Sequence, residues 1–306
     1  MTRAQAVAEE AAAAKTAAAK AAAENFPVAL RMLPRRYRRH LMAVYCFART
    51  VDDAGDLAPP DQRQHLLAGL EEDLRQLYRA MDEGERGGGG IGAANAADAH
   101  LPHPQPAVRG LADAIADCQI PMQPFLDLIM ANQQDQAVTR YAAFDDLLGY
   151  CRLSANPVGR IVLHIFGCAT PERLQRSDEI CTGLQIAEHL QDVAEDMRAG
   201  RVYLPAADMH SYGCTEQDLT RAVAPPRLRR LIAFEAGRAR SLLDAGAPLV
   251  GTLRGAPRAA VAGYLAGGRA TLAAIGRADY DVLASAPRPA KSRTFGELLV
   301  AFVRGR

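Results

Sequence analysis

Two pairs of aspartates, each separated by three residues, are the part of this sequence best suited to chemistry. Asp52 and Asp56 form the first pair, and Asp192 and Asp196 form the second. Residues four apart in an α-helix lie on one face, so the carboxylates of each pair are expected to be neighbours. Like charges this close raise each other's pKa unless a cation binds between them. Because Mg²⁺ prefers oxygen ligands and often bridges protein to phosphate, the pairs predict a diphosphate substrate bound through Mg²⁺.

The second pair belongs to an amphipathic stretch that is expected to be helical. Residues 180–205 read ICTGLQIAEHLQDVAEDMRAGRVYLP and fit an α-helix through about Met197. Gln185 and Glu188 share the face of the two aspartates, and apolar residues occupy the other face. An acidic face turned towards solvent on a surface helix is the alternative interpretation of this stretch alone.

The first pair repeats this design. Residues 45–56 read YCFARTVDDAGD and place Tyr45 and Arg49 on the face of the two aspartates, with apolar residues on the far side. Two such helices could face each other across a cavity. Four carboxylates that converge there are costly without cations, which favours a bound divalent metal.

The pattern along the chain predicts an all-α protein, because no stretch shows sustained alternation of apolar and polar residues. Residues 1–23 are rich in Ala and read as a solvated tail. A catalytic helical domain is expected over residues 24–295, with a flexible Gly-, Ala- and Pro-rich insertion at 83–106. Residues 296–306 are expected to form a last short helix.

Composition excludes some classes of function. There are 36 basic and 35 acidic residues, so the charge gives no case for binding nucleic acid. The six cysteines are scattered and form no C-x-x-C pair, which favours buried thiols in a reducing cytosol. No apolar run approaches the ~20 residues of a membrane span, and the N-terminus lacks a hydrophobic signal core. The expected location is the cytoplasm.

Three further features have two interpretations each. Pro157 lies inside the helical stretch 144–167, where it is either a purely structural kink or a device that exposes a backbone dipole to a cavity. The arginines within residues 35–39 are either a solvated helix face or a basic cluster at the mouth of a diphosphate site. His164 and His189 are single histidines inside helices and are expected to be structural rather than functional.

These motifs resemble the squalene/phytoene synthase family over about Glu24 to Arg293. The family has two aspartate-rich helices, here Asp52-x-x-x-Asp56 and Gln185-x-x-Glu188-x-x-x-Asp192-x-x-x-Asp196 followed by Arg201-x-Tyr203-x-Pro205. The segments ENFPVA, YCRLSANPVGR and RADYDVL resemble the hydroxysqualene synthase branch of the hopanoid route. Three positions differ from the wider family pattern: Glu188 where Asn is usual, Gln191 where many members have Arg, and Gly55 where some have an acid.

The resemblance implies an isoprenoid-synthase-type helical bundle around a central cavity, acting on presqualene diphosphate. Departure of the diphosphate would leave a cation that rearranges and is captured by water, so Mg²⁺ is expected and NADPH is not. Two or three Mg²⁺ ions are expected at the metal ligands, namely Asp52, Asp56, Glu188, Asp192 and Asp196. The implied substrate-binding residues are Phe26, Arg49 and Arg201, and the implied catalytic residues are Tyr45, Arg49, Tyr150, Asn156, Gln185 and Tyr203. Asn156 is the residue expected to position the water.

Two other functions compete with this interpretation. A head-to-head prenyltransferase making presqualene diphosphate, squalene or phytoene would use the same acidic motifs. A non-catalytic helical assembly factor would keep the fold, but eroded acidic motifs are expected in such a protein. Because the implied substrate is apolar, the protein could also contact the inner face of the membrane peripherally. Handover to other squalene-pathway enzymes is a second open alternative.

Overall fold

The computed structural model describes residues 33–86 and 105–287. Within these residues the only departure from helix and loop is an isolated bridge between Arg140 and Val202, so the all-α prediction is confirmed. The predicted tail 1–23, the final helix 296–306 and most of the insertion lie outside the described residues.

The contacts divide the chain into two compact units. The first comprises Met1–Gln136 and Ile161–Gly167, and the second comprises Ala137–Arg160 and Cys168–Arg306. The two aspartate pairs fall in different units. One catalytic domain over residues 24–295 therefore stays a prediction.

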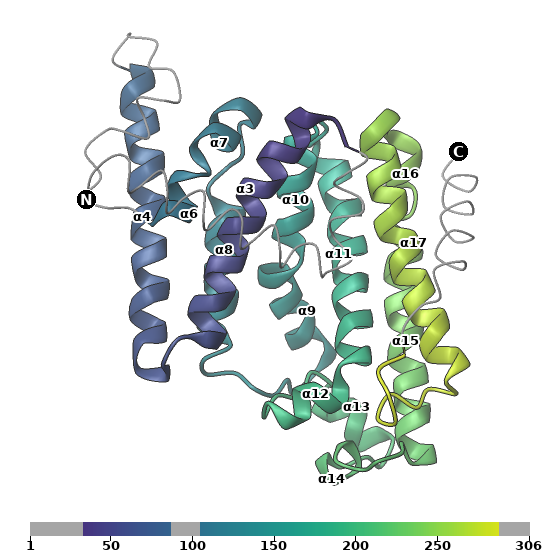
Figure 1. Ribbon diagram of the computed structural model, residues 1–306. Helices are drawn as coiled ribbons and strands as arrows, with labels where there is room; N and C mark the ends of the chain where they lie inside the picture. Colours follow the sequence, from purple (N-terminus) through teal and green to yellow (C-terminus); the bar gives the residue numbers. More distant parts are fainter. Residues whose placement is uncertain (1–32, 87–104, 288–306) are drawn as a thin grey trace. The chain divides into compact units, whose positions relative to one another are not determined.

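The first unit is built on three helices, α3, α4 and α8 (Figure 1). Its elements are α3 (Arg35–Asp52), the π-helical turn η1 (Asp53–Leu57), α4 (Pro60–Arg86), α6 (Pro106–Arg109), α7 (Ala112–Cys118) and α8 (Gln123–Gln134). The predicted apolar side of α3 is buried, and Phe47 meets Phe125 of α8 edge to face with ring centroids 5.3 Å apart. Helix α4 continues through Arg86, so the predicted start of the insertion at Glu83 is wrong. The charged residues that follow the buried leucines of α4 have good helix propensity, so the helix can continue through them.

The arginine cluster lies at the start of α3, and the first aspartate pair lies at its end. Asp52 lies seventeen positions after Arg35, which corresponds to about 25 Å along the helix axis. Arg39 instead binds Asp117 at 3.0 Å and Asp113 at 3.5 Å. A basic cluster at the mouth of the site around Asp52 is thus not supported, and the arginines form a solvated, partly ion-paired helix face.

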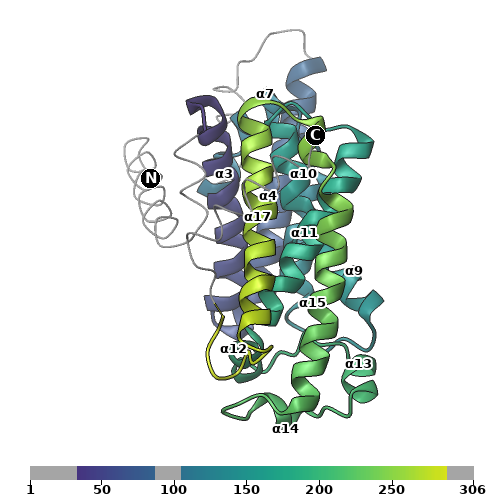
Figure 2. The same ribbon diagram turned by 90° about the vertical axis from the view of Figure 1, so that its right-hand side faces the viewer.

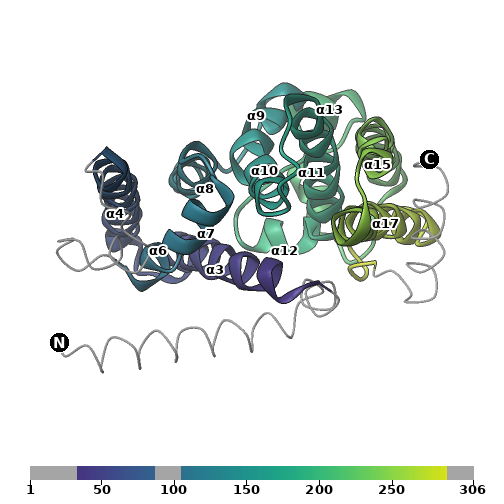
Figure 3. The same cartoon turned by 90° about the horizontal axis from the view of Figure 1, so that it is seen from above.

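The second unit packs three long helices, α11, α15 and α17, along one another (Figure 2). Figure 3 shows the same helices from above. Its elements are α9 (Phe144–Ser154), α10 (Asn156–Ile165, whose last residues count in the first unit), α11 (Pro171–Gln191), α12 (Val193–Arg198), α13 (Ala206–Ser211), α14 (Glu216–Leu219), α15 (Pro226–Gly246), α16 (Leu249–Thr252) and α17 (Gly255–Arg277). Glycines allow α11 and α15 to approach closely. A Cβ on Gly183 would lie 3.0 Å from the Ala239 carbonyl oxygen of α15.

Two expectations from composition can be compared with the described residues. All six cysteines are free thiols, and Cys151 and Cys214 are buried while the other four are half-buried. Burial raises the pKa of Cys151 to about 12, as expected for an unreactive thiol. Among the described helices, none combines the length and the apolar character needed to cross a bilayer.

Candidate active site

The first acidic motif lies where α3 changes its helical form. Asp52 ends α3, and η1 follows as a single π-helical turn, closed by the Ala58 amide, which donates to the Asp53 carbonyl at 3.1 Å. The sequence predicted a regular helix to about Asp56, so that detail is wrong. Pro59 and Pro60 follow the turn and lack the N–H groups that a continued helix would need there, which is the local sequence signal for its end. π-helical turns occur frequently at functional sites.

The carboxylates of this motif are neighbours, as the spacing predicts. Partial burial raises the pKa of Asp52, and the nearby carboxylates of Asp56 and Asp53 raise it further. A hydrogen bond from Asn132 Nδ2 to Asp52 Oδ1, 3.3 Å long, and the charge of Arg49 act in the opposite direction. The motif therefore holds a carboxylate whose charged form is under-stabilised and would gain from a cation.

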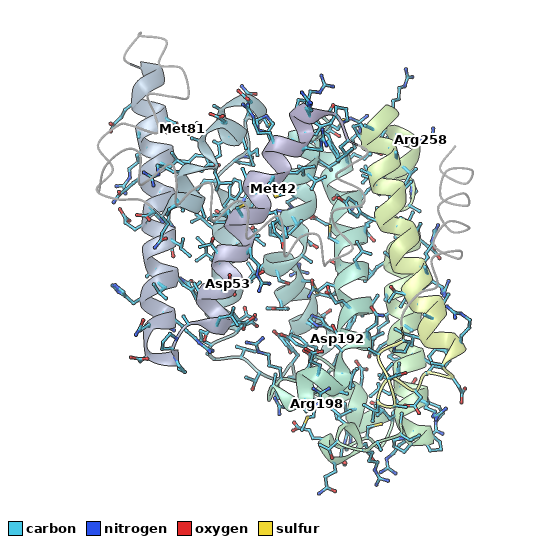
Figure 4. The ribbon with its side chains drawn as sticks, viewed as in Figure 1. Met42, Asp53, Met81, Asp192, Arg198 and Arg258 are labelled. Carbon is cyan, nitrogen blue, oxygen red and sulfur yellow. The ribbon has the colours of Figure 1, made fainter. Side chains whose placement is uncertain are left out.

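Arg49 lies one turn before the motif and has donors suited to an anion. Its Nη2 is 2.9 Å from Asp53 Oδ1, and its side chain is 31% exposed. The buried Nε of Arg49 has no hydrogen-bond partner among the described residues. Tyr45, another turn earlier on α3, is half-buried. Figure 4 labels Asp53, the first residue of η1, which follows the helix that carries these two groups.

The second acidic motif also interrupts its helix. Helix α11 ends at Gln191, and Asp192 has φ −101° and ψ 11°, so the predicted continuous helix through about Met197 is wrong. Figure 4 labels Asp192 at this junction with α12. The Asp196 amide donates to the Asp192 carbonyl at 2.8 Å, which keeps the two aspartates one turn apart. Gln191, a departure from the family pattern, donates through its amide to the carbonyl of Pro287.

Asp196 is a carboxylate whose surroundings disfavour its charged form. Burial raises its pKa to about 7, and the charges of Asp192, Glu195 and Glu188 add to this while Arg201 opposes it. Its buried Oδ2 has no hydrogen-bond partner among the described residues, and His189 Nδ1 is 4.0 Å away. Carboxylate oxygens are preferred Mg²⁺ ligands, so the donor chemistry fits this ion.

The predicted metal centre as a whole is not tested. No group of three or more His, Cys, Asp or Glu side chains within 33–86 and 105–287 is arranged to hold a metal ion. Glu188 is exposed on α11. Since the two aspartate pairs lie in separate units, the sharing of Mg²⁺ between them stays a prediction.

Arg201 and Tyr203 follow the second motif in a segment fixed by backbone hydrogen bonds. Gly200 has φ +82°, a conformation that glycine adopts readily, and it lets the Arg201 amide donate back to the Asp196 carbonyl at 2.8 Å. The Val202 amide donates to the Thr139 carbonyl at 2.9 Å. Arg201 and Tyr203 are thereby held beside the end of α12.

A pocket in the second unit brings charged and apolar groups together. Its charged and polar members include Asp196, Arg201 and Glu235, and Tyr203 lines it as well. The remaining lining residues are Leu147, Ile186, His189, Leu190, Val193, Val202, Leu204, Pro205 and Leu219. The predicted apolar side of the second motif thus forms a wall next to its acidic end.

A cluster of aromatic rings includes two residues that line this pocket, His189 and Tyr203. His189 stacks on Tyr203 with ring centroids 3.7 Å apart, and Tyr150 lies 5.7 Å from Tyr203. Tyr141, which the sequence analysis did not select, stacks on Tyr203 at 5.7 Å. The sequence does not mark Tyr141 as a site residue, because a single tyrosine before a helix cannot be told from an ordinary core residue. The prediction for Tyr150 and Tyr203 as members of one site agrees with this arrangement.

His189 lies in the pocket wall, although it is not among the site residues expected from the sequence. Gln185 Nε2 lies 3.1 Å from His189 Nε2, so the predicted site residue Gln185 contacts the ring directly. Burial lowers the pKa of His189 to about 3, and the ring is therefore neutral at pH 7. Its position four residues after Gln185 placed it on the same helix face, which was the available signal.

Asn156 is held in place by α11. Thr182 Oγ1 donates to Asn156 Oδ1 at 2.9 Å, and Asn156 is only 4% exposed. The stretch around Pro157 is a break between α9 and α10 at Ala155 rather than a kink within one helix. Proline is common in the first turn of a helix, where its missing N–H is not needed. Phe26, the remaining predicted residue, lies outside the described residues.

Comparisons with known proteins show which family the chain resembles. The squalene/phytoene synthase family model matches residues 19–294. Hydroxysqualene synthase of Rhodopseudomonas palustris is 35% identical over 232 residues, which cover 76% of this chain and 72% of that protein. Hydroxysqualene synthase of Zymomonas mobilis is 34% identical over 221 residues, covering 72% and 67%. Phytoene synthase of Mycobacterium tuberculosis is 31% identical over 234 residues, covering 75% and 70%.

Solved structures have the same fold. The crystal structure of squalene synthase HpnC from Alicyclobacillus acidocaldarius matches with a TM-score of 0.75 and 38% identity, covering 89% of this chain and 96% of that one. A dehydrosqualene synthase in complex with ligand matches with a TM-score of 0.79 and 21% identity, covering 98% of both chains. These matches confirm the isoprenoid-synthase-type helical fold. With the family match over residues 19–294, they establish that the chain belongs to the squalene/phytoene synthase family.

Proposed function

We propose that this chain is a Mg²⁺-dependent hydroxysqualene synthase, which converts presqualene diphosphate and water to hydroxysqualene and diphosphate. The observation that carries the proposal is the pocket of the second unit. Asp196 and Arg201 line it together with apolar residues such as Ile186 and Leu190. A leaving diphosphate needs charged partners and a carbocation needs an apolar wall, and this pocket has both. The relatives named hydroxysqualene synthase support the choice of branch.

The charged residues would hold the diphosphate during ionisation. Asp52, Asp56, Asp192 and Asp196, with Glu188 nearby, are the proposed Mg²⁺ ligands, and the bound ion would neutralise the developing charge of the leaving group. Arg49 has an Nε donor without a partner among the described residues, and Arg201 borders the pocket. Both guanidinium groups would donate charge-assisted hydrogen bonds to diphosphate oxygens as the C–O bond breaks.

The aromatic cluster would stabilise the cation that remains. Tyr203 is on the pocket wall, and Tyr150 and His189 pack against its ring. Aromatic faces attract positive charge, and a neutral His189 adds no repelling charge of its own. Tyr45 and Phe26 are proposed for the same role. Exclusion of bulk water by the buried wall would let the cation rearrange before capture.

Asn156 is proposed to position the capturing water. Its Oδ1 already accepts from Thr182, and a carbonyl oxygen has a second lone pair that can accept from a water. A water so oriented presents its oxygen to the cation, forms the new C–O bond and releases one proton. An Asn156→Ala variant should give less alcohol and more side products. An unchanged alcohol yield and product profile would remove this role.

The decisive assay uses purified protein with presqualene diphosphate and Mg²⁺, without NADPH. Formation of hydroxysqualene supports the proposal, and it also tests the expectation that NADPH is not needed. No turnover of presqualene diphosphate, with consumption of farnesyl diphosphate instead, would support a head-to-head prenyltransferase. No turnover of either substrate would favour the non-catalytic assembly factor.

Matched variants link the activity to the site. Asp196→Asn should lose turnover, because a neutral amide is a poor Mg²⁺ ligand. Glu195→Gln is the control, since Glu195 is an exposed carboxylate on the same short helix. Equal loss in both variants would contradict the assignment of Asp196. Cytoplasmic location, peripheral contact with the membrane and handover of product to other squalene-pathway enzymes remain part of the proposal and need fractionation and co-purification experiments.

A further inference from the structure

We infer that Asn132 is a positioning residue for the first acidic motif, and that Gly55 is a glycine because Asn132 occupies the space of its missing side chain. The inference deepens the proposed function and rests on it for the role of Asp52. All of its contacts lie in the first unit, between η1 and its neighbours α8 and α4.

Asn132 connects the motif to α8. Its Nδ2 donates to Asp52 Oδ1 and to the Leu128 carbonyl, each at 3.3 Å. The second bond, four residues back along α8, fixes the side chain against its own helix. The amide is therefore oriented towards one carboxylate oxygen of Asp52, which leaves Oδ2 to other partners.

Gly55 makes this approach possible. A Cβ built on Gly55 would overlap Asn132 Oδ1 and would lie 3.2 Å from its Cγ and 3.3 Å from its Cβ. A larger residue at this position must therefore displace the Asn132 amide from Asp52.

The π-helical turn is stabilised by Arg63 of α4 and by Gln136, which follows the end of α8. Gln136 Nε2 donates to the Gly55 carbonyl at 3.1 Å and to the Asn132 carbonyl at 2.9 Å. Arg63 of α4 donates from Nη2 to the Asp56 carbonyl at 2.8 Å and from Nε to the Ala58 carbonyl at 2.9 Å. The residues four places after Gly55 and Asp56 are Pro59 and Pro60, which have no N–H, so these side chains satisfy two carbonyls that have no helical donor. The backbone that carries Asp56 is thus fixed by its neighbours, and Asn132 adds the contact that reaches a carboxylate.

The test combines single and double variants with two measurements. The variants are Asn132→Ala, Gly55→Ala, their combination and the control Gly69→Ala, whose Cβ would have no neighbour within 4 Å. The first measurement is kcat and KM for presqualene diphosphate. The second is the rise in unfolding temperature caused by Mg²⁺ with inorganic pyrophosphate, titrated to half-saturation, which needs no turnover. Unfolding without these ions reports on structure alone.

Loss of an outer hydrogen bond to a metal ligand typically lowers metal affinity or activity ~10–100-fold. We expect a loss of this size in Asn132→Ala and in Gly55→Ala, in kcat and in the half-saturating ion concentration. The double variant should lose no more than either single variant, because both act through one contact. Gly69→Ala should match the original chain.

Two results would overturn the inference. One is an Asn132→Ala variant within twofold of the original chain in both measurements. The other is a double variant whose loss is the product of the two single losses, which would mean that Gly55 acts without Asn132. If the original chain fails to convert presqualene diphosphate, the proposed function fails, but the pyrophosphate titration still decides whether Asn132 positions the motif.

Discussion

Replacing Gly246 by alanine should destabilise the packing of α11 against α15, which supports the second acidic motif. A Cβ on Gly246 would lie 2.7 Å from the Arg176 carbonyl oxygen and 3.0 Å from the Ile180 amide nitrogen. Both are backbone atoms of α11 and cannot rotate away. Arg176 also donates from Nη1 to the Ala245 carbonyl at 2.9 Å, so the same approach of the helices includes a hydrogen bond.

The size of the effect follows from the distances. Ordinary contact begins at 3.4 Å, so α15 must move from α11 by about 0.7 Å to accept the methyl group. Overpacking of this kind typically costs ~1–3 kcal/mol. We expect Gly246→Ala to lower the free energy of unfolding by about 2 kcal/mol. Gly237→Ala on the same helix should raise it by about 0.5–1 kcal/mol, because nothing lies within 4 Å of its Cβ and alanine favours helix.

Urea unfolding followed by circular dichroism measures both variants against the original chain. The signs should be opposite, and the difference between the two variants should reach about 3 kcal/mol. Gly237→Ala should leave the turnover of presqualene diphosphate unchanged. A Gly246→Ala variant within 0.5 kcal/mol of the original chain would refute the argument from close helix approach, because exposed-site changes are typically within about that range.

Three other predictions concern pH, the water and the metal. Burial raises the pKa of Glu235 to about 7 from 4.5 despite the charge of Arg238, so the folded state binds this proton more tightly and stability falls as the pH rises between those values. The fall in the free energy of unfolding should be at most about 3 kcal/mol. Glu235→Gln should abolish it, which urea unfolding at about pH 5 and about pH 8 measures. Thr182→Val should cost about 1 kcal/mol and lower the alcohol share of the products, measured by gas chromatography, because it removes the hydrogen bond that orients Asn156. Chelation of divalent ions should abolish turnover, and added Mg²⁺ should restore it; activity that survives chelation would contradict the metal requirement.

The helical fold was predictable because apolar periodicity records burial. Val44, Phe47 and Val51 on α3 are buried as their spacing predicts, and so are Ile186 and Leu190 on α11. Interruptions of the helices were not predictable in the same way. The sequence has no proline or glycine at Asp192, and the break there depends on tertiary contacts that a pattern along one helix does not contain.

Only those features of the site that depend on residue type and on spacing along one helix could be predicted. The Asp52 and Asp196 environments have the mutual carboxylate effects that the four-residue spacing predicts. His189 was left out of the predicted site because a lone histidine on a helix is usually structural, and its stacking on Tyr203 is a tertiary contact that the sequence does not show. Asn132 was missed for a different reason. It lies 80 positions from the aspartate it contacts, and no motif connects them.

Both acidic motifs leave regular α-helical geometry at their aspartates, and this shared feature favours a functional origin. A π-helical turn follows Asp52, and a helix break falls at Asp192. At η1 the Gly55 carbonyl, which lacks a helical donor because residue 59 is proline, accepts instead from Gln136 Nε2 at 3.1 Å. Irregular backbone persists only where its surroundings determine it, and such positions cluster at active sites. Gln136→Ala should leave the Gly55 carbonyl without its partner and loosen the backbone between Asp52 and Asp56, so it should weaken the Mg²⁺–pyrophosphate response more than it lowers stability.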